Sequence, residues 1–185
     1  MASQFSFLAA EFIEVHDFAI RAEGIARTDA RGACFYARLT LETIVDWLYR
    51  HDQTLRSPYD TTLSARIHEA TFKALVGVAL LAKARVVKDL GNKAAHEAKT
   101  IPPADGVAAV RELFHLCYWL VRTYARGETP SGTLTFSADA LPLNKAVAAE
   151  RLDQLKAAAD RFVEAVKARD AAESQLRASD ESRER

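Results

Sequence analysis

Apolar residues recur at three- and four-residue intervals along most of the chain as far as about residue 126. That spacing places them on one face of an α-helix and leaves charged residues on the other. The second helix has the broadest apolar face, so we expect it to be central and most buried. The predicted helices span about 5–26, 30–50, 63–68, 71–76, 78–91 and 104–126. The fold class is therefore predicted to be all-α, with a helical bundle over residues 1–126.

Helix breaks in the sequence agree with these boundaries. Asp29 offers an N-cap for the second helix, because its side chain can accept a bond from a free backbone amide. Ser57 and Pro58 lie in a polar stretch, residues 52–62, that is typical of a loop. Pro103 can occupy the first turn of the last bundle helix, where its missing amide hydrogen costs nothing.

Beyond the bundle the character of the chain changes. Residues 127–144 contain Pro130, Gly132 and a short β-prone run, and we interpret them as a linker, open to lying against the bundle. Residues 145–178 are rich in Ala, Glu, Lys and Arg and predict a long amphipathic helix resembling a coiled coil. The polar end, 179–185, is predicted to be disordered.

The long helix carries an apolar seam at alternating steps of three and four residues. The seam consists of Leu152, Leu155, Ala159, Phe162 and Val166. An isolated helix would leave this stripe in water at a cost on the order of several kcal/mol. The seam must therefore pack on its own bundle, on a second copy of the chain, or on further domains. Self-association to a dimer, or docking to other domains or subunits, is the expected partner interaction.

Composition narrows the function classes. Lys plus Arg number 25 and Asp plus Glu number 25, so the formal net charge is zero. A protein whose main task is gripping nucleic-acid backbone usually carries a basic excess, so any such contact must come from a local patch and is expected to be weak. Cys34 and Cys117 lie in apolar surroundings and read as packing residues. No phosphate-binding loop, metal-ligand spacing or cofactor motif occurs in the chain.

Targeting and membrane signals are also absent from the sequence. The first residues lack a basic region followed by an apolar core, and the most apolar stretch, 72–82, is too short to span a bilayer. We therefore expect a cytoplasmic protein with no membrane partner.

The segment most suited to chemistry runs from Lys83 to Glu97. If the helix continues through Gly91, four polar residues share one of its faces: Arg85, Asp89, Asn92 and His96. Gly91 has two interpretations, since it either admits a closely packed helix or ends its own helix as a C-cap. The cationic residues here are candidates for phosphate contact or for a solvated helix face: Lys83, Arg85, Lys88, Lys93 and Lys99. A further stripe of Arg38, Glu42 and Asp46 predicts ion pairing along the second helix.

Three separated blocks of sequence carry a family resemblance. The run Leu90-Gly-Asn-Lys-Ala-Ala-His-Glu97 resembles the "GN-x-A-x-HE" signature of the small helical domain, of unassigned function, at the N terminus of type I restriction enzyme motor (R) subunits and related helicases. Residues 31–39, followed by Trp47-Leu-Tyr49, and residues 111–119 look similar to the blocks that flank it. The resemblance covers about residues 5–126. It implies a non-catalytic accessory or assembly module in defence against foreign DNA, whose nuclease and ATP-driven translocase lie elsewhere in the full protein.

That domain is in turn similar to the HEPN superfamily of helical bundles, many of which are metal-independent RNases. Their motif places an Arg, a polar residue and, a few positions later, a His, and here Asn92 and His96 match the last two. Gly91 stands where the Arg is expected, so the chain itself is expected not to be catalytic. The alternative is an RNase in which His96 transfers protons and Arg85 binds the phosphate. A third hypothesis is a purely structural homodimerisation module.

Overall fold

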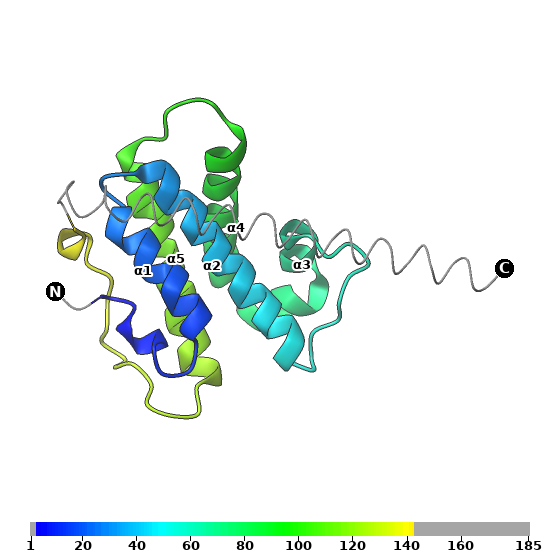
Figure 1. Ribbon diagram of the computed structural model, residues 1–185. Coiled ribbons are helices and arrows are strands. Elements are labelled where there is room, and N and C mark those ends of the chain that lie inside the picture. Colours follow the sequence, from blue (N-terminus) through cyan, green and yellow to red (C-terminus); the bar gives the residue numbers. More distant parts are fainter. Residues whose placement is uncertain (1–2, 143–185) are drawn as a thin grey trace. The chain divides into compact units, whose positions relative to one another are not determined.

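The computed structural model describes residues 3–142, and within that range every regular element is helical (Figure 1). The all-α prediction is confirmed for this part of the chain. The elements are η1 (Ser6–Leu8), α1 (Ile13–Ile25), α2 (Ala30–His51), α3 (Leu63–His68), α4 (Ala70–His96), α5 (Pro103–Tyr124) and η2 (Ala138–Ala140). The segments expected beyond residue 142, namely the seam helix over 145–178 and the end at 179–185, lie outside the described residues.

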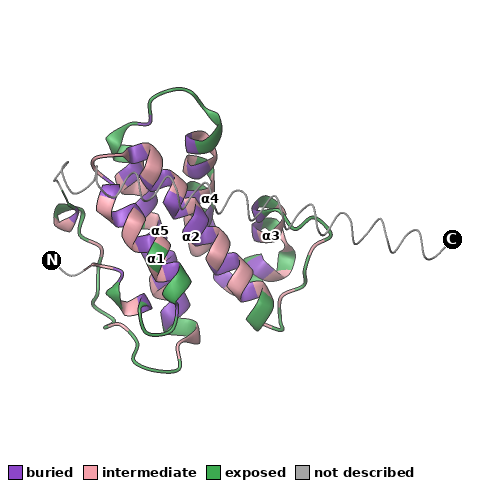
Figure 2. Ribbon diagram, viewed as in Figure 1, coloured by how far each residue is buried: buried purple, intermediate pink, exposed green. Residues whose placement is uncertain are grey.

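Helix α2 is the centre of the bundle, as its broad apolar face predicts. It contacts α1, α4 and α5, and its fully buried side chains point to several sides of the helix. Figure 2 shows buried positions along the inward faces of its neighbours and exposed positions on the connecting loops. The start of α2 follows the predicted cap, because the Asp29 carboxylate accepts a bond from the Gly32 amide at 2.9 Å.

The first helix is shorter than the periodicity suggests. A helix was expected over residues 5–26, but the chain forms the short η1, turns at residues 9–12 and only then begins α1. The turn places the Glu11 carboxylate against the end of α5, where it accepts the amides of Arg126 (2.9 Å) and Gly127 (2.8 Å). Those two amides lower the pKa of Glu11. A contact between positions this far apart in sequence leaves no periodic signal in the first helix.

Helix α4 bends where the sequence places a glycine. Gly77 has φ 72° and ψ 173°, a combination of positive φ and extended ψ that only glycine adopts without strain. The predicted pieces, 71–76 and 78–91, are thus two arms of one bent helix. The second arm continues through Gly91 to His96, beyond its expected end.

The 127–142 segment, expected as a linker, lies along the bundle. Its residues up to Pro142 belong to the same compact unit as the helices, and it passes beside η1 and α5 (Figure 1). Phe136 packs on Phe114 of α5 with ring centroids 5.8 Å apart, and Leu141 is buried. The β-prone run inside the segment forms no strand in the described structure.

Both cysteines are buried, unpaired packing residues, in agreement with the sequence. Burial raises the pKa of the Cys34 thiol to about 11 and raises that of Cys117 further, so neither is a ready nucleophile. None of the helices in residues 3–142 is both long and apolar enough to cross a membrane.

Candidate functional site

The polar residues of the signature segment share one face of α4, as their spacing predicts. Because α4 continues to His96, that face runs along the whole second arm of the helix. Arg85, Asp89 and His96 are exposed on it and Asn92 is half-buried. Within residues 3–142 the His96 side chain has no hydrogen-bond partner, so nothing orients its ring for proton transfer.

Gly91 lies where α4 comes close to α2. A Cβ atom built on Gly91 would lie 2.3 Å from Cβ of Arg38 and 2.6 Å from its Cδ, well inside van der Waals contact. Of the two interpretations left open by the sequence, close approach of another helix is therefore the one the structure supports. Gly91 does not end its helix, since the Glu97 amide still bonds to the Lys93 carbonyl at 3.0 Å.

The aliphatic part of the Arg38 side chain packs on Gly91, whereas its guanidinium group pairs with another residue of α2. One guanidinium nitrogen pairs with Oε1 of Glu42 at 2.7 Å, one turn along α2, as the charged stripe predicts. The Nε atom is buried and lacks a hydrogen-bond partner among the described residues. Asp46, the third member of the stripe, pairs instead with Arg66 of α3. The stripe thus forms one ion pair within α2 and one between α2 and α3.

Arg31 holds the C-terminal end of α4 in place. Its guanidinium donates to the carbonyl oxygen of Ala94 and, at 2.6 Å, to that of Lys99. Carbonyls at a helix C-terminus have no intrahelical partner, and a cation there also complements the helix dipole. The sequence marks Arg31 only as part of a family-like block and gives no sign of this role.

The cationic patch expected on α4 is largely neutralised by neighbouring acids. Lys83 pairs with Glu112 of α5 at 2.7 Å, and Lys93 pairs with Asp105 of α5 at 3.0 Å. Lys88 pairs with its chain neighbour, Asp89, at 2.7 Å. The structure therefore favours the interpretation of these three lysines as interhelix and surface ion pairs. Two of the five candidates, Arg85 and Lys99, form no ion pair within residues 3–142.

A second polar cluster joins α4 to α5, and the sequence did not single it out. Glu112 accepts bonds from Lys83 and from Arg111 (2.9 Å), and His115 Nδ1 lies 3.7 Å from Glu112 Oε2. Burial opposes ionisation of Glu112, but the two hydrogen bonds outweigh it and the pKa of the carboxyl is lowered. Burial, helped by the Lys83 charge, lowers the pKa of His115. The only signal for this cluster is that Glu112 and His115 lie in the third family-like block.

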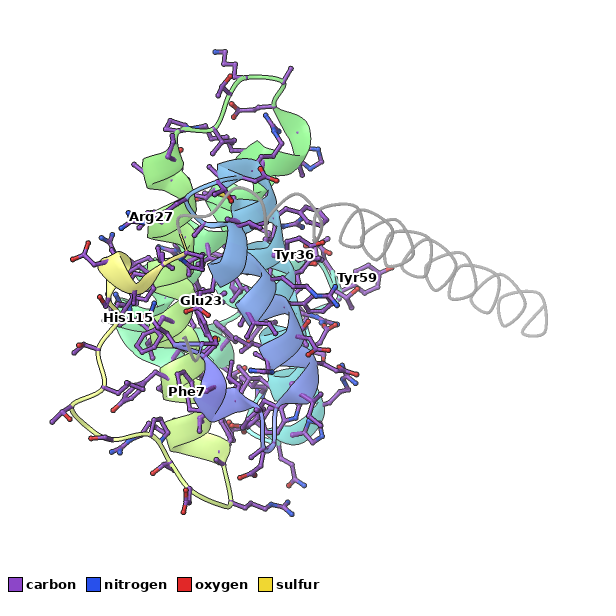
Figure 3. All side chains as sticks on the ribbon, turned by 60° about the vertical axis from the view of Figure 1, so that its left-hand side comes forward. Phe7, Glu23, Arg27, Tyr36, Tyr59 and His115 are labelled. Carbon is purple, nitrogen blue, oxygen red and sulfur yellow. The ribbon has the colours of Figure 1, made fainter. Side chains whose placement is uncertain are left out.

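The first block and the signature therefore meet in space, and the third block contacts α4 just before the signature. Arg31 and Arg38 of the first block contact Ala94 and Gly91 of the signature, and Lys83 just before the signature pairs with Glu112 of the third block. Figure 3 shows how densely side chains fill the space between the helices, with His115 on the side of the bundle that the 127–142 segment crosses. We call the contact of Arg31, Arg38, Gly91 and Ala94 the α2–α4 junction.

The arginines of the junction are engaged within the bundle. They pair with Glu42 or donate to backbone carbonyls, and Gly91 is buried whereas His96 is exposed. No group of three or more His, Cys, Asp or Glu side chains within residues 3–142 is placed to hold a metal ion. What the arrangement does chemically is fix the spacing and register of two helices.

Comparison with known protein families gave a match that assigns no activity to the chain. A model of the DUF4145 family, described as a domain of unknown function, matches residues 21–158. That range includes the junction and the α4–α5 cluster, and it reaches past the end of the 127–142 segment. Neither the comparison with curated proteins nor that with solved structures gave a match. The family match covers more than half of the 185 residues, and the chain therefore belongs to the DUF4145 family.

Proposed function

We propose that this chain is a non-catalytic assembly module, equivalent to the N-terminal accessory domain that it resembles in type I restriction motor subunits. The observation that carries the proposal is the use of the signature residues: Gly91 and Ala94 receive Arg38 and Arg31 from α2 and so close a helix contact. Residues that pack two helices against each other form a scaffold, and their side chains are not free to bind or convert a substrate. The cellular setting, defence against foreign DNA, follows from the resemblance alone.

In this proposal the bundle presents the seam helix to its partner. Leu152, Leu155 and Phe162 then pack on the same residues of a second copy, in a HEPN-like bundle extended by a coiled coil. Burying an apolar stripe of that kind is the usual driving force for helix pairing. A chain with balanced charge also suits protein contacts better than a sequence-independent grip on nucleic acid.

The assembly proposal is tested by measuring the solution mass of the full chain by light scattering. We expect a dimer for the natural sequence and a monomer for Leu155→Glu/Phe162→Glu, because two carboxylates would face each other across the seam. The control is Gln154→Glu/Arg161→Glu, which changes as many residues outside the seam and should leave the dimer intact. A monomer at every concentration of the natural chain would contradict self-association.

A metal-independent RNase is the second candidate, with His96 to transfer protons and Arg85 to bind the phosphate. In its favour, Arg85 and His96 are both exposed on α4, and Arg85 forms no ion pair within residues 3–142. Incubating the pure chain with single-stranded RNA decides between the two candidates. The assembly proposal expects no cleavage by the natural chain. Cleavage that disappears in both His96→Ala and Arg85→Ala, but persists in Lys73→Ala, an exposed lysine at the other end of α4, would establish the RNase instead.

A further inference from the structure

One face of the bundle, formed by residues next to η1, residues at the end of α1 and residues of α5, holds the 127–142 segment largely through hydrogen bonds to the segment's backbone. Four side chains donate to carbonyl oxygens of the segment, each at 2.8–3.3 Å. These pairs are Gln4 with Ser137, Arg27 with Ala138, Tyr118 with Ser131 and Arg122 with Pro130. Gln4 lies before η1 and Arg27 just after α1, while Tyr118 and Arg122 both belong to α5. The face therefore contacts an extended chain over nine residues, 130–138. We call it the peptide face.

Gln4 makes the most specific of these contacts. Its Nε2 donates to the Ser137 carbonyl at 3.1 Å, while its Oε1 accepts the Ser137 amide at 2.7 Å. A side-chain amide that bonds both groups of one residue imitates a neighbouring β-strand. The backbone of Gln4 is in turn held by the buried Glu23, whose Oε1 accepts the backbone N–H of Gln4 at 2.9 Å.

Two side chains of the segment supply the apolar part of the contact. Phe136 packs on Phe114, which also stacks against Phe5 and Phe7 in an edge-to-face manner, and Leu141 is only 2% exposed. Before these anchors, Leu134 is 39% exposed, and between them the exposed Asp139 pairs with Arg27 at 3.6 Å. The peptide face therefore selects an aromatic residue followed five positions later by an aliphatic one, and Arg27 favours an acidic residue between the two.

We infer that the peptide face is a docking site for an extended peptide and that its partner in trans is the same 127–142 segment of a second copy. The bonds that hold the segment in cis lie at the surface, where each contributes modestly and can be remade with an identical chain. Exchange of an identical element is a low-cost route to a dimer. The inference deepens the proposed function and rests on it, because paired seam helices would bring the second segment to a comparable effective concentration.

The place where the segment would leave its own bundle is also defined. Glu11 fixes the amides of Arg126 and Gly127, and the first contact of the segment proper is at Pro130. Glu128 and Thr129, which lie between Gly127 and Pro130, are exposed and form no hydrogen bond or ion pair with other residues of the 3–142 range. A change of direction in these residues redirects the segment without disturbing α5.

The test uses a fluorescent peptide of residues 128–142 and the full chain carrying Phe136→Ala/Leu141→Ala, in which the cis segment is weakened. Fluorescence anisotropy is expected to show saturable binding, at least tenfold tighter than to the natural chain, whose own segment competes. The same peptide with Phe136→Ala should lose binding, whereas Leu134→Ala should keep it. If the double variant loses its helical circular dichroism, Phe136→Ala alone replaces it, since Phe136 is only half-buried.

A second pair of variants locates the binding on the peptide face. Adding Gln4→Ala to the weakened chain should reduce affinity about tenfold or more, because two hydrogen bonds are lost. Gln53→Ala, on the exposed loop after α2, should change nothing. Absence of binding to a folded, weakened chain, or equal binding to the natural chain, would overturn the inference. Neither result affects the mass measurement on the seam variants, so failure here is distinguishable from failure of the assembly proposal.

Discussion

Gly91 shows how one missing side chain sets the distance between two helices. Any Cβ at this position would overlap the Arg38 stem, so glycine is required by packing and not by backbone conformation, since only Gly77 has a positive φ in residues 3–142. Helix propensity disfavours glycine by about 1 kcal/mol relative to alanine. At this position the gain in helix contact outweighs that cost.

Replacing Gly91 by alanine should therefore destabilise the fold although alanine favours helices. We expect the free energy of unfolding to fall by about 1–3 kcal/mol, the usual cost of overpacking. Urea denaturation followed by circular dichroism measures it. Gly132→Ala is the control, because a Cβ there meets nothing within 4 Å and should change stability little. A Gly91→Ala chain as stable as the natural one would show that α2 and α4 separate without cost.

The sequence anticipates this residue only in part. Spacing places Gly91 in a helix and leaves two explanations, close packing or a helix end, because it does not reveal what lies opposite. The partner is Arg38, and the intervening distance along the chain hides the contact from any local pattern. The same holds for Arg31, whose bonds to Ala94 and Lys99 depend on the register of α2 against α4.

At the scale of elements, local signals locate helices well and long-range contacts decide where they end. Asp29 and Pro103 mark the starts of α2 and α5 as predicted, because capping and proline geometry act within a few residues. The end of α4 was expected near Gly91 but lies at His96, where Arg31 binds the free carbonyls. The turn before α1 was not predicted, because it depends on Glu11 meeting the end of α5.

The bend in α4 gives a prediction about the backbone. Gly77→Ala should lower the free energy of unfolding by about 1–3 kcal/mol, because an L-residue is strained at a positive φ combined with a ψ near 180°. Gly77→Asn should cost about as much, because this ψ lies outside the small αL region that asparagine tolerates. Thermal unfolding of the two variants beside the natural chain measures both losses. Unchanged stability in both would contradict backbone strain at Gly77, since no neighbouring atom lies within 4 Å of an added Cβ.

The contact between α4 and α5 should depend on pH through Glu112. Its folded pKa lies below the ordinary 4.5, so the ionised carboxylate stabilises the fold above about pH 4.5 and loses this effect as the pH falls through the folded pKa. Glu112→Gln should thus be less stable than the natural chain at pH 7, with the gap shrinking below pH 4.5. Denaturation midpoints from pH 7 to pH 3 test this. Glu14→Gln, an exposed acid of α1, should run parallel to the natural chain.

At the scale of the whole molecule, the folded unit is larger than its helices. The sequence places the end of the bundle at about residue 126, where the helical periodicity stops. The structure adds the 127–142 segment, which carries the buried Leu141 and the Phe136 contact. Periodicity cannot detect such a segment, because an extended chain held by scattered side chains has no repeat.

Two shortened chains test the size of the unit. A chain ending at Pro142 should unfold in one cooperative transition, because the helices and the 127–142 segment form one compact unit. A chain ending at Arg126 should be less stable by about 2–4 kcal/mol, because it loses the burial of Leu141 and Phe136 and leaves aromatic surface exposed. Thermal unfolding monitored by circular dichroism compares them. Equal midpoints would show that the segment adds nothing to the bundle.

The backbone contacts of the 127–142 segment also bear on how its sequence can change over time. Ser137 and Ala138 are held by their main-chain groups, so almost any side chain satisfies the same bonds. Substitutions at these positions should change the stability of the fold little and are therefore weakly selected against, whereas Phe136 and Leu141 are constrained by burial. We therefore expect the sequences of related chains to differ widely in this segment, with only the positions of Phe136 and Leu141 remaining recognisable in an alignment.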